Sequence, residues 1–523
     1  MSTLSLNTPV EQREPAAAAV GRTSRLLFIP LLLLQAGFFL YVAQHRLIDD
    51  DEGYYLLASR LVMQHKAPYL DFFYTQAPLL PYVYAAWFKL AGASWYAARI
   101  FCALLSTLVG GLLYYHVCRE TGKWLAGACT AFLYATSTLI FAWYPIVKTF
   151  ALAMLFLFPA YLIFTRLSPS TRGWMVGMAG VLFGLSVDTR SYVVGLAPVF
   201  LWWLLRQRSG RSTARIAWFL GGLGIGIVPS LVLFLASPDA FLFNNLGYHA
   251  MRSGVGLIGD WHDKMMVAAA TMGGAYTGFQ FSVVSLSALA LVVLQRARRA
   301  SALLALLLAL VLGLVSLLPT PASIQYFSLI MPFLIVTAVT SASDYLDALR
   351  SARTVRLVGA GCALLLVGFF LFAVPIFRQY LFTGRKVPGL QNMADAPNWT
   401  LSQVTAVSKA VDELAMPGEQ VASFWPGYIF ASWANPYPGF ENNFGMWVAP
   451  SFAPQKRQQY HIISLADVNQ EFARHGPRLV VVGNQGPWNA APEYAACAAT
   501  LRAYSYRLVG MVGDTSIYQC CSQ

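Results

Sequence analysis

The chain has 523 residues, of which 57% are hydrophobic and only 11% are charged, and its formal net charge is +13. Several uncharged apolar stretches of about 20 residues exclude an ordinary soluble protein and indicate a polytopic membrane protein. The excess of Lys and Arg does not indicate nucleic-acid binding, because in a membrane chain the positions of these residues set the topology. The seven Cys residues form no CxxC pair, which argues against a structural zinc site.

The N-terminal segment, residues 1–25, is rich in Ala and polar residues, and we expect a disordered cytoplasmic tail there. The first apolar stretch, residues 26–42, lacks a small-x-small cleavage signal before Gln44. We therefore interpret it as a retained signal anchor rather than a removed signal peptide.

Four consecutive acids, Asp49-Asp50-Asp51-Glu52, follow this first apolar stretch and open a long segment at residues 45–96. Within that segment, residues 52–66 have the spacing of a short interfacial helix, and residues 78–90 are aromatic and apolar. A solvated acidic turn is the plain interpretation of such a run. Carboxylates at a membrane boundary can also act as a general base or bind a metal ion.

Apolar spans recur along the chain as far as about residue 375 and predict about 11 transmembrane helices. Their starts lie near residues 26, 97, 124, 149, 173, 191, 216, 266, 301, 324 and 357.

Basic residues lie in every second connection between these spans. The positive-inside rule therefore places the N-terminus and these connections in the cytoplasm. The acidic run and everything after about residue 375 then face outward. We expect a multi-pass protein of the bacterial inner (plasma) membrane. The basic clusters are Arg119 with Lys123, Arg166 with Arg172, Arg206 to Arg215, Arg296 to Arg299 and Arg350 to Arg356.

The C-terminal segment, residues 376–523, regains charged and turn residues, and β-rich runs alternate there with helical patterns. We expect a small extracytoplasmic α/β domain. In an oxidising compartment, Cys497 could pair with Cys520 or Cys521. The expected elements lie at residues 402–414, 420–424, 468–474, 478–482 and 506–512.

Several short motifs resemble those of the GT-C membrane glycosyltransferases, in particular the protein mannosyltransferase-like and aminoarabinose transferase-like branch. The resemblance covers residues 26–375 in layout and is strongest in the first outer loop, about residues 45–96. This branch often has a second proline and a Lys before Pro78, where this chain has Gln76-Ala77, and often an acid where this chain has Lys148. The motifs are Asp51-Glu52-x-Tyr54, Pro68-Tyr69-x-Asp71, Ala77-Pro78-Leu79-Leu80-Pro81-Tyr82, Ala98-Arg99-Ile100, Asp188-Thr189-Arg190-Ser191 and Gln325-Tyr326 with Pro332.

The resemblance implies a transmembrane glycosyltransferase domain at residues 26–375. Such an enzyme moves a sugar from a polyprenyl-phosphate donor to a lipid, glycan or protein acceptor on the extracytoplasmic face. Asp51 would be the general base, and Glu52 would orient the acceptor or a metal ion. Asp49 and Asp50 would be solvated acids at a helix end. No cofactor follows with certainty, and a divalent cation held by Asp51, Glu52 or Asp71 is left open.

The departing lipid phosphate requires cations at the outer face, and Arg190 is the main candidate. Asp188 would either hold Arg190 or form a purely structural pair with it, and Lys148 would supplement its charge. A turn role for Asp71 and a packing role for Tyr326 remain open alternatives. The further substrate-binding candidates are Tyr54, Asp71, His249, Arg252, Gln325 and Tyr326.

Two alternatives keep the same membrane topology. An oligosaccharide ligase or lipid-modifying transferase would use the same donor with a larger acceptor. A secondary transporter would explain the many helices, but it predicts internal repeats and ionisable residues at mid-membrane, and the sequence shows neither clearly.

Overall fold

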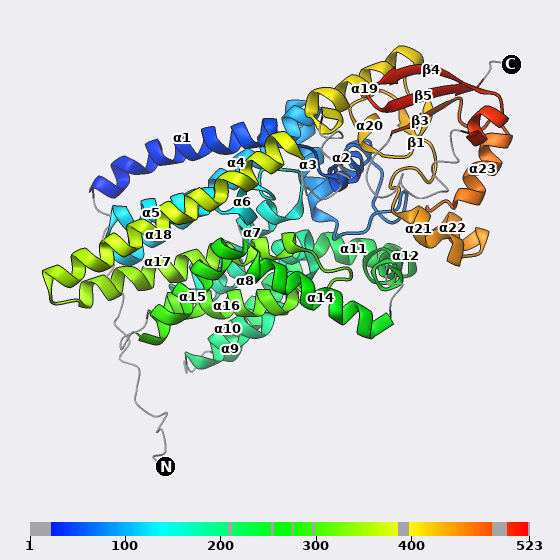
Figure 1. Ribbon diagram of the computed structural model, residues 1–523. Coiled ribbons are helices and arrows are strands. Elements are labelled where there is room, and N and C mark those ends of the chain that lie inside the picture. The colour runs from blue at the N-terminus through cyan, green and yellow to red at the C-terminus, as the bar shows by residue number, and fades with distance from the viewer. Residues whose placement is uncertain are drawn as a thin grey trace.

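The computed structural model describes residues 22–207, 212–252, 256–274, 277–294, 299–384, 397–483 and 499–520. Long helices run side by side through most of the molecule, and a small β-sheet lies at one end of them (Figure 1). Most of the tail predicted for residues 1–25 lies outside the described residues, as do Cys497 and Cys521.

Five helical segments are long and apolar enough to cross a membrane. They contain α1 (Arg22–His45), α4 (Trp95–Thr121), α15 (Thr277–Leu294), η3 (Ile324–Leu329) with α17 (Met331–Ala348), and α18 (Ala352–Arg378) with η4 (Gln379–Thr383).

A sixth segment is bent by 60° between α10 (Ser212–Gly226) and α11 (Val228–Ala236). Five shorter apolar helical segments join them, so the described part of the chain has eleven apolar helical segments, of which six are long enough to cross a membrane. The multi-span helical membrane fold is therefore confirmed, while its orientation stays a prediction. The shorter ones are α5 (Trp124–Thr136), α7 (Thr149–Phe164), α8 (Gly173–Thr189), η1 (Ser191–Leu196) with α9 (Ala197–Arg206), and α16 (Ala300–Val315). A single helical turn, α6 (Thr138–Phe141), lies between α5 and α7.

One predicted span begins later than expected. The span placed near residue 266 is α15, which begins at Thr277. Residue 266 lies instead in α14 (Gly256–Gly273), a separate helix that carries Asp260, His262, Asp263 and Lys264 and is therefore too polar to cross a membrane as a whole. The chain reaches α14 through α12 (Pro238–Leu242), η2 (Phe243–Gly247) and α13 (Tyr248–Met251).

Glycines allow α8 and α10 to approach closely. A Cβ atom on Gly222 would lie 2.0 Å from the carbonyl oxygen of Gly177, and one on Gly226 would lie 2.7 Å from the Cα atom of Gly184. Such close backbone contact is typical of membrane helices with small residues four apart. It fixes the end of α8, where Arg190 follows.

The outer loop contains α2 (Asp50–Met63), close to the predicted helix at residues 52–66, and α3 (Leu79–Ala91), which coincides with the aromatic and apolar stretch at residues 78–90. However, α2 is not an interfacial helix on the surface, because every residue from Glu52 to Leu61 is buried. The C-terminal segment covers it.

The C-terminal segment contains a mixed five-stranded sheet in the order β2-β1-β3-β5-β4. β1 pairs in parallel with β2 and β3, and β5 pairs antiparallel with β3 and β4. The small α/β fold is confirmed, with three strands and two helices where they were predicted. The strands are β1 (Gln420–Ser423), β2 (Asn435–Pro436), β3 (Leu479–Val482), β4 (Tyr506–Val512) and β5 (Thr515–Cys520). The helices are α19 (Leu401–Leu414), α20 (Gly427–Phe430), α21 (Gly445–Val448), η6 (Ala449–Ser451), α22 (Pro454–Gln459) and α23 (Leu465–Ala473).

Buried polar contacts join this segment to α2. The guanidinium group of Arg60 donates to four backbone carbonyl oxygens within residues 429–434, at 2.6–3.2 Å. The indole N–H of Trp425 donates to the carbonyl oxygen of Asp50 at 2.8 Å. Gly53 gives the Trp425 ring room, because a Cβ atom there would lie 2.8 Å from it. The sheet segment thus holds the acidic end of α2 in place.

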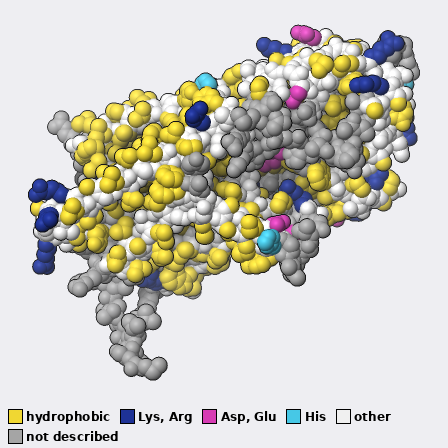
Figure 2. Space-filling model, viewed as in Figure 1, with side chains coloured by type: hydrophobic (Ala, Val, Ile, Leu, Met, Phe, Trp, Pro, Cys, Tyr) yellow, Lys and Arg dark blue, Asp and Glu magenta, His cyan; other side chains and the backbone are white. Residues whose placement is uncertain are grey.

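Hydrophobic side chains spread over the flank of the helices. One group of Lys and Arg lies at the end away from the sheet, and others are scattered over the sheet segment (Figure 2). Arg350, Arg353 and Arg356 are exposed where α17 turns into α18. This distribution agrees with the predicted cytoplasmic end.

Candidate active site

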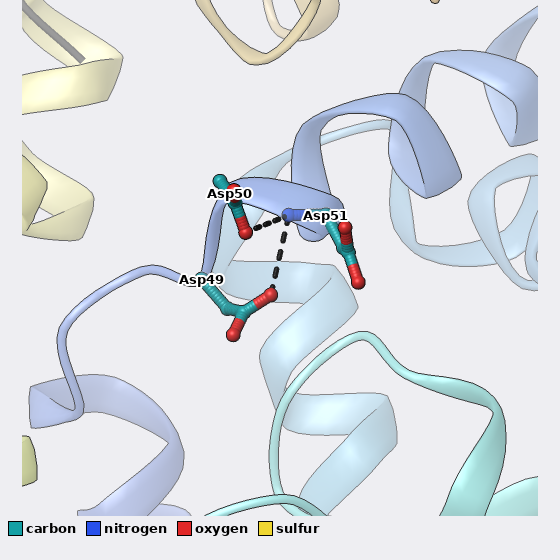
Figure 3. A group of neighbouring side chains, drawn as sticks. All are labelled: Asp49, Asp50 and Asp51. Atoms are coloured by element: carbon teal, nitrogen blue, oxygen red, sulfur yellow. Dashed lines mark hydrogen bonds between the residues drawn. The ribbon is translucent and has the colours of Figure 1, made fainter. Parts of the chain in front are cut away.

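The acidic run forms the first turn of α2 (Figure 3). Asp49 is the N-cap: its carboxylate accepts the Asp51 N–H at 3.2 Å, and the Glu52 carboxylate accepts the Asp49 N–H at 2.8 Å. The Asp50 carboxylate also accepts the Asp51 N–H, at 2.9 Å. This reciprocal capping box and the positive end of the helix dipole stabilise several acids at one helix end.

Glu52 is fully buried and pairs with Arg99 rather than with Lys148. Its two oxygens accept two N–H groups of Arg99, each at 2.6 Å, and one of them also accepts the Val147 N–H at 3.0 Å. A buried carboxylate requires this kind of compensation. Glu52 therefore joins α2 to α4 and to the start of α7.

Lys148 lies between two of the other acids. Its ammonium nitrogen is 2.5 Å from a carboxylate oxygen of Asp49 and also pairs with Asp51. Asp49 and Lys148 are almost completely buried, whereas the Asp51 side chain is 25% exposed. The expectation that Asp49 is a solvated acid is wrong, because the N-cap contacts and the Lys148 charge allow it to be buried.

Asp50 is half-buried and forms no ion pair with a described Lys or Arg residue. Partial burial, followed by the negative charges of Asp51 and Asp49, raises the pKa of Asp50 from 3.8 to about 8. The three aspartates thus have three different environments: a capped and paired one, an unpaired one, and a paired one with access to solvent.

A cavity of about 290 Å³ opens beside these aspartates and brings together residues from distant parts of the chain. Seven predicted site residues line it: Asp51, Tyr54, Lys148, Arg190, Arg252, Gln325 and Tyr326. The other wall residues are Asp49, Asp50, Tyr55, Thr75, Gln76, Phe150, Tyr248, Pro321, Ala322, Ser323 and Phe444.

Arg190 is buried in the wall of this cavity among aromatic rings. Its guanidinium carbon lies 4.7–5.1 Å from the ring centres of Phe150, Tyr192 and Tyr326. Its Nε–H has no hydrogen-bond partner, and no described carboxylate forms an ion pair with it. The predicted pair with Asp188 is not formed, because the Asp188 carboxylate instead accepts the Ser230 N–H at 3.2 Å.

Three predicted site residues do not line the cavity. Glu52 is engaged with Arg99, and Asp71 is exposed and accepts the Ala67 N–H at 2.6 Å, as a turn residue would. His249 donates from Nε2 to the carbonyl oxygen of Thr75 at 2.8 Å. Removal from water lowers the pKa of His249 to about 4, so the imidazole is neutral near pH 7.

Several wall residues were not predicted. The spacing of Asp49 and Glu52, Asp-x-x-Glu before a helix, is the signature of a capping box and could have revealed Asp49 as an N-cap. Tyr55 follows the predicted Tyr54 directly. Phe444 comes from the C-terminal segment, and no sequence signal connects it to a site that is almost 400 residues earlier.

Residues 75–234 match the family model described as dolichyl-phosphate-mannose-protein mannosyltransferase. The match covers 160 of the 523 residues and indicates a membrane glycosyltransferase. This match supports the predicted resemblance. It begins at residue 75, near the end of the outer loop, and includes Lys148 and Arg190 but not Asp51.

The fold of the chain is similar to that of ArnT from Cupriavidus metallidurans, a protein solved both in the apo state and bound to undecaprenyl phosphate. The TM-scores are 0.65 and 0.64, respectively, at 14% sequence identity, and each comparison covers 95% of this chain and 99% of ArnT. At this identity the comparison shows a shared fold. No curated protein sequence is significantly similar to the chain.

Proposed function

We propose that this glycosyltransferase transfers a sugar from a polyprenyl-phosphate donor to an acceptor on the outer face of a bacterial inner membrane. The observation that carries the proposal is the composition of the cavity. It contains the accessible carboxylate of Asp51 and the guanidinium group of Arg190, which has no carboxylate partner among the described residues. A base and an anion-binding group in one cavity are the two requirements of the reaction.

Asp51 is proposed as the general base. Its carboxylate would accept the proton of the acceptor nucleophile as that atom attacks the anomeric carbon of the sugar. The bond between that carbon and the phosphate oxygen would break, and the configuration of the carbon would invert. Lys148 pairs with Asp51 and holds its carboxylate at the wall of the cavity.

Arg190 and Arg252 are proposed to bind the donor phosphate. Breaking the bond to the sugar increases the negative charge on the phosphate, so fixed guanidinium groups stabilise the transition state more than the bound donor. Burial of Arg190 among aromatic rings orients the group in advance. Arg252 is exposed and lies over the rings of Tyr248 and Phe444, 5.5 and 6.0 Å from their centres.

The undecaprenyl phosphate bound to ArnT supports a lipid phosphate as the donor carrier. The acceptor class, whether lipid, glycan or protein, follows from the resemblance alone. The secondary-transporter hypothesis explains neither the family match nor the base beside the phosphate-binding group.

Mass spectrometry of lipid-linked sugars and envelope glycans in cells with and without the protein tests the proposal. Cells without it should accumulate one sugar-charged polyprenyl phosphate and lose the same sugar from one envelope component. Unchanged levels of both in cells that otherwise express the protein would contradict the proposal. Restoration by the Asp71→Asn variant but not by Asp51→Asn would assign the effect to the cavity.

A further inference from the structure

Lys148 lies among Asp49, Asp50 and Asp51, whose carboxylates are spaced as metal ligands are. One carboxylate oxygen from each of Asp49, Asp50 and Asp51 lies within 4.8 Å of the other two, a spacing that suits a shared cation. Divalent cations such as Mg²⁺ and Mn²⁺ prefer carboxylate oxygens of this kind. In this chain, however, the Lys148 ammonium group lies 2.5 Å from Asp49 and pairs with Asp51.

Lys148 cannot readily give way to an ion from solution. It is the N-cap residue of α7, and its side chain is only 3% exposed. The indole ring of Trp143 covers it, with the ammonium nitrogen 5.7 Å from the ring centre. An ammonium group held in place and a divalent cation at the same carboxylates would repel each other strongly. The residues present therefore do not fit a divalent cation at this group.

We propose that Lys148 is the built-in cation of this active site and replaces a divalent ion there. This inference rests on the proposed function. A lysine ammonium is a compact point charge with three N–H donors, so it can bridge two carboxylates as a small metal ion would. It neutralises Asp49, holds Asp51 at the cavity and supplies positive charge beside the donor phosphate. Sugar transfer then requires no divalent ion, and removal of the lysine charge opens a cation site among the aspartates.

The test uses the full-length protein in nanodiscs, treated with EDTA, and Mn²⁺ as the probe. The Lys148→Met variant keeps the length of the side chain without its charge. We expect it to bind Mn²⁺ and its thermal midpoint to rise by at least about 3 °C with Mn²⁺, because a ligand that binds only the folded state stabilises it. The wild-type midpoint should not change. Addition of Asp51→Asn to Lys148→Met should remove the gain.

Lys123→Met is the matched control, because Lys123 forms an exposed ion pair with Asp347 outside the cavity. This variant should gain no response to Mn²⁺. A folded Lys148→Met variant that binds no Mn²⁺ would overturn the inference. If Lys148→Met does not fold, Lys148→Gln replaces it. The wild type also gives a test without any Lys148 variant. If it binds Mn²⁺ and Asp49→Asn abolishes that binding, the inference is overturned.

These binding measurements use no sugar donor, so they remain valid if the proposed reaction is wrong. Wild-type transfer that stops in EDTA and returns with Mn²⁺ would reject the role of Lys148 and leave the transferase assignment intact. Absence of any sugar transfer under all conditions would reject the proposed function, while the cation response of Lys148→Met would still stand.

Discussion

Asp50 and Asp51 follow each other in the chain, but their carboxylates have different partners. Asp51 pairs with Lys148 and is partly exposed to the cavity. Asp50 has no such pair, and its backbone carbonyl is held by Trp425. One residue is therefore suited to accept a proton from a substrate, and the other mainly affects the charge and stability of the site.

The pKa of Asp50 predicts a pH dependence of stability. In the unfolded chain this carboxyl ionises near pH 4, as an ordinary Asp does, whereas in the folded protein its pKa is about 8. The folded state thus binds this proton more tightly than the unfolded state does. Proton binding at Asp50 therefore stabilises the folded protein at low pH, and this stabilisation is lost as the pH rises toward 8. Asn resembles the protonated acid. We expect Asp50→Asn to reduce the fall in thermal midpoint between about pH 5 and 8. An unchanged pH profile would contradict the raised pKa.

The Arg190→Ala variant should weaken use of the donor. Loss of a charged hydrogen-bond donor costs about 1.5–3 kcal/mol, which corresponds to a 10- to 100-fold effect. We expect this loss in kcat/KM for the donor, with a smaller effect on KM for the acceptor. Arg206→Ala is the control, because Arg206 packs on Trp202 and Trp203 away from the cavity. A selective effect on the acceptor would remove Arg190 from the phosphate site.

At the scale of the elements, α2 depends on the buried pair of Glu52 and Arg99. Glu52→Gln leaves the Arg99 charge buried without compensation, which typically destabilises a protein by about 3–5 kcal/mol. We expect a lower thermal midpoint and less folded protein, with activity per folded molecule largely kept. The double variant Glu52→Gln/Arg99→Met should recover part of the stability. A stable Glu52→Gln protein without activity would instead favour the catalytic role predicted from the sequence.

The sequence contained the local features of this site but not its long-range contacts. Hydropathy predicted the spans, and the acidic run with the Pro-Leu turn predicted the outer loop that holds α2. The partner of Glu52 could not be predicted, because Arg99 is 47 residues away and only the packing of α2 against α4 brings it close. For the same reason Lys148, 97 residues from Asp51, was predicted at the site but not as its ion-pair partner.

At the scale of the whole molecule, the sheet lies at one end and the turn between α17 and α18 lies at the other (Figure 1). Arg350 and Arg353 are exposed at this turn, whereas the acidic end of α2, which lines the cavity, is held by the sheet segment. This polarity agrees with an outer active site and a cytoplasmic basic end. We therefore predict that alkaline phosphatase fused after Gln523 is active, while a fluorescent protein fused there is dark. The same reporters placed at Arg350 should give the opposite result. Cytoplasmic behaviour of the C-terminal fusion would reverse the topology.

The most direct test of the account measures release of free polyprenyl phosphate from the sugar-charged donor by purified protein in nanodiscs, with acceptor present. We predict that Asp51→Asn lowers the rate by at least about 100-fold with an unchanged thermal midpoint, as expected for loss of a general base. Asp71→Asn, in the same loop but outside the cavity, should keep most of the activity. Wild-type rates from a folded Asp51→Asn protein would show that another group is the base.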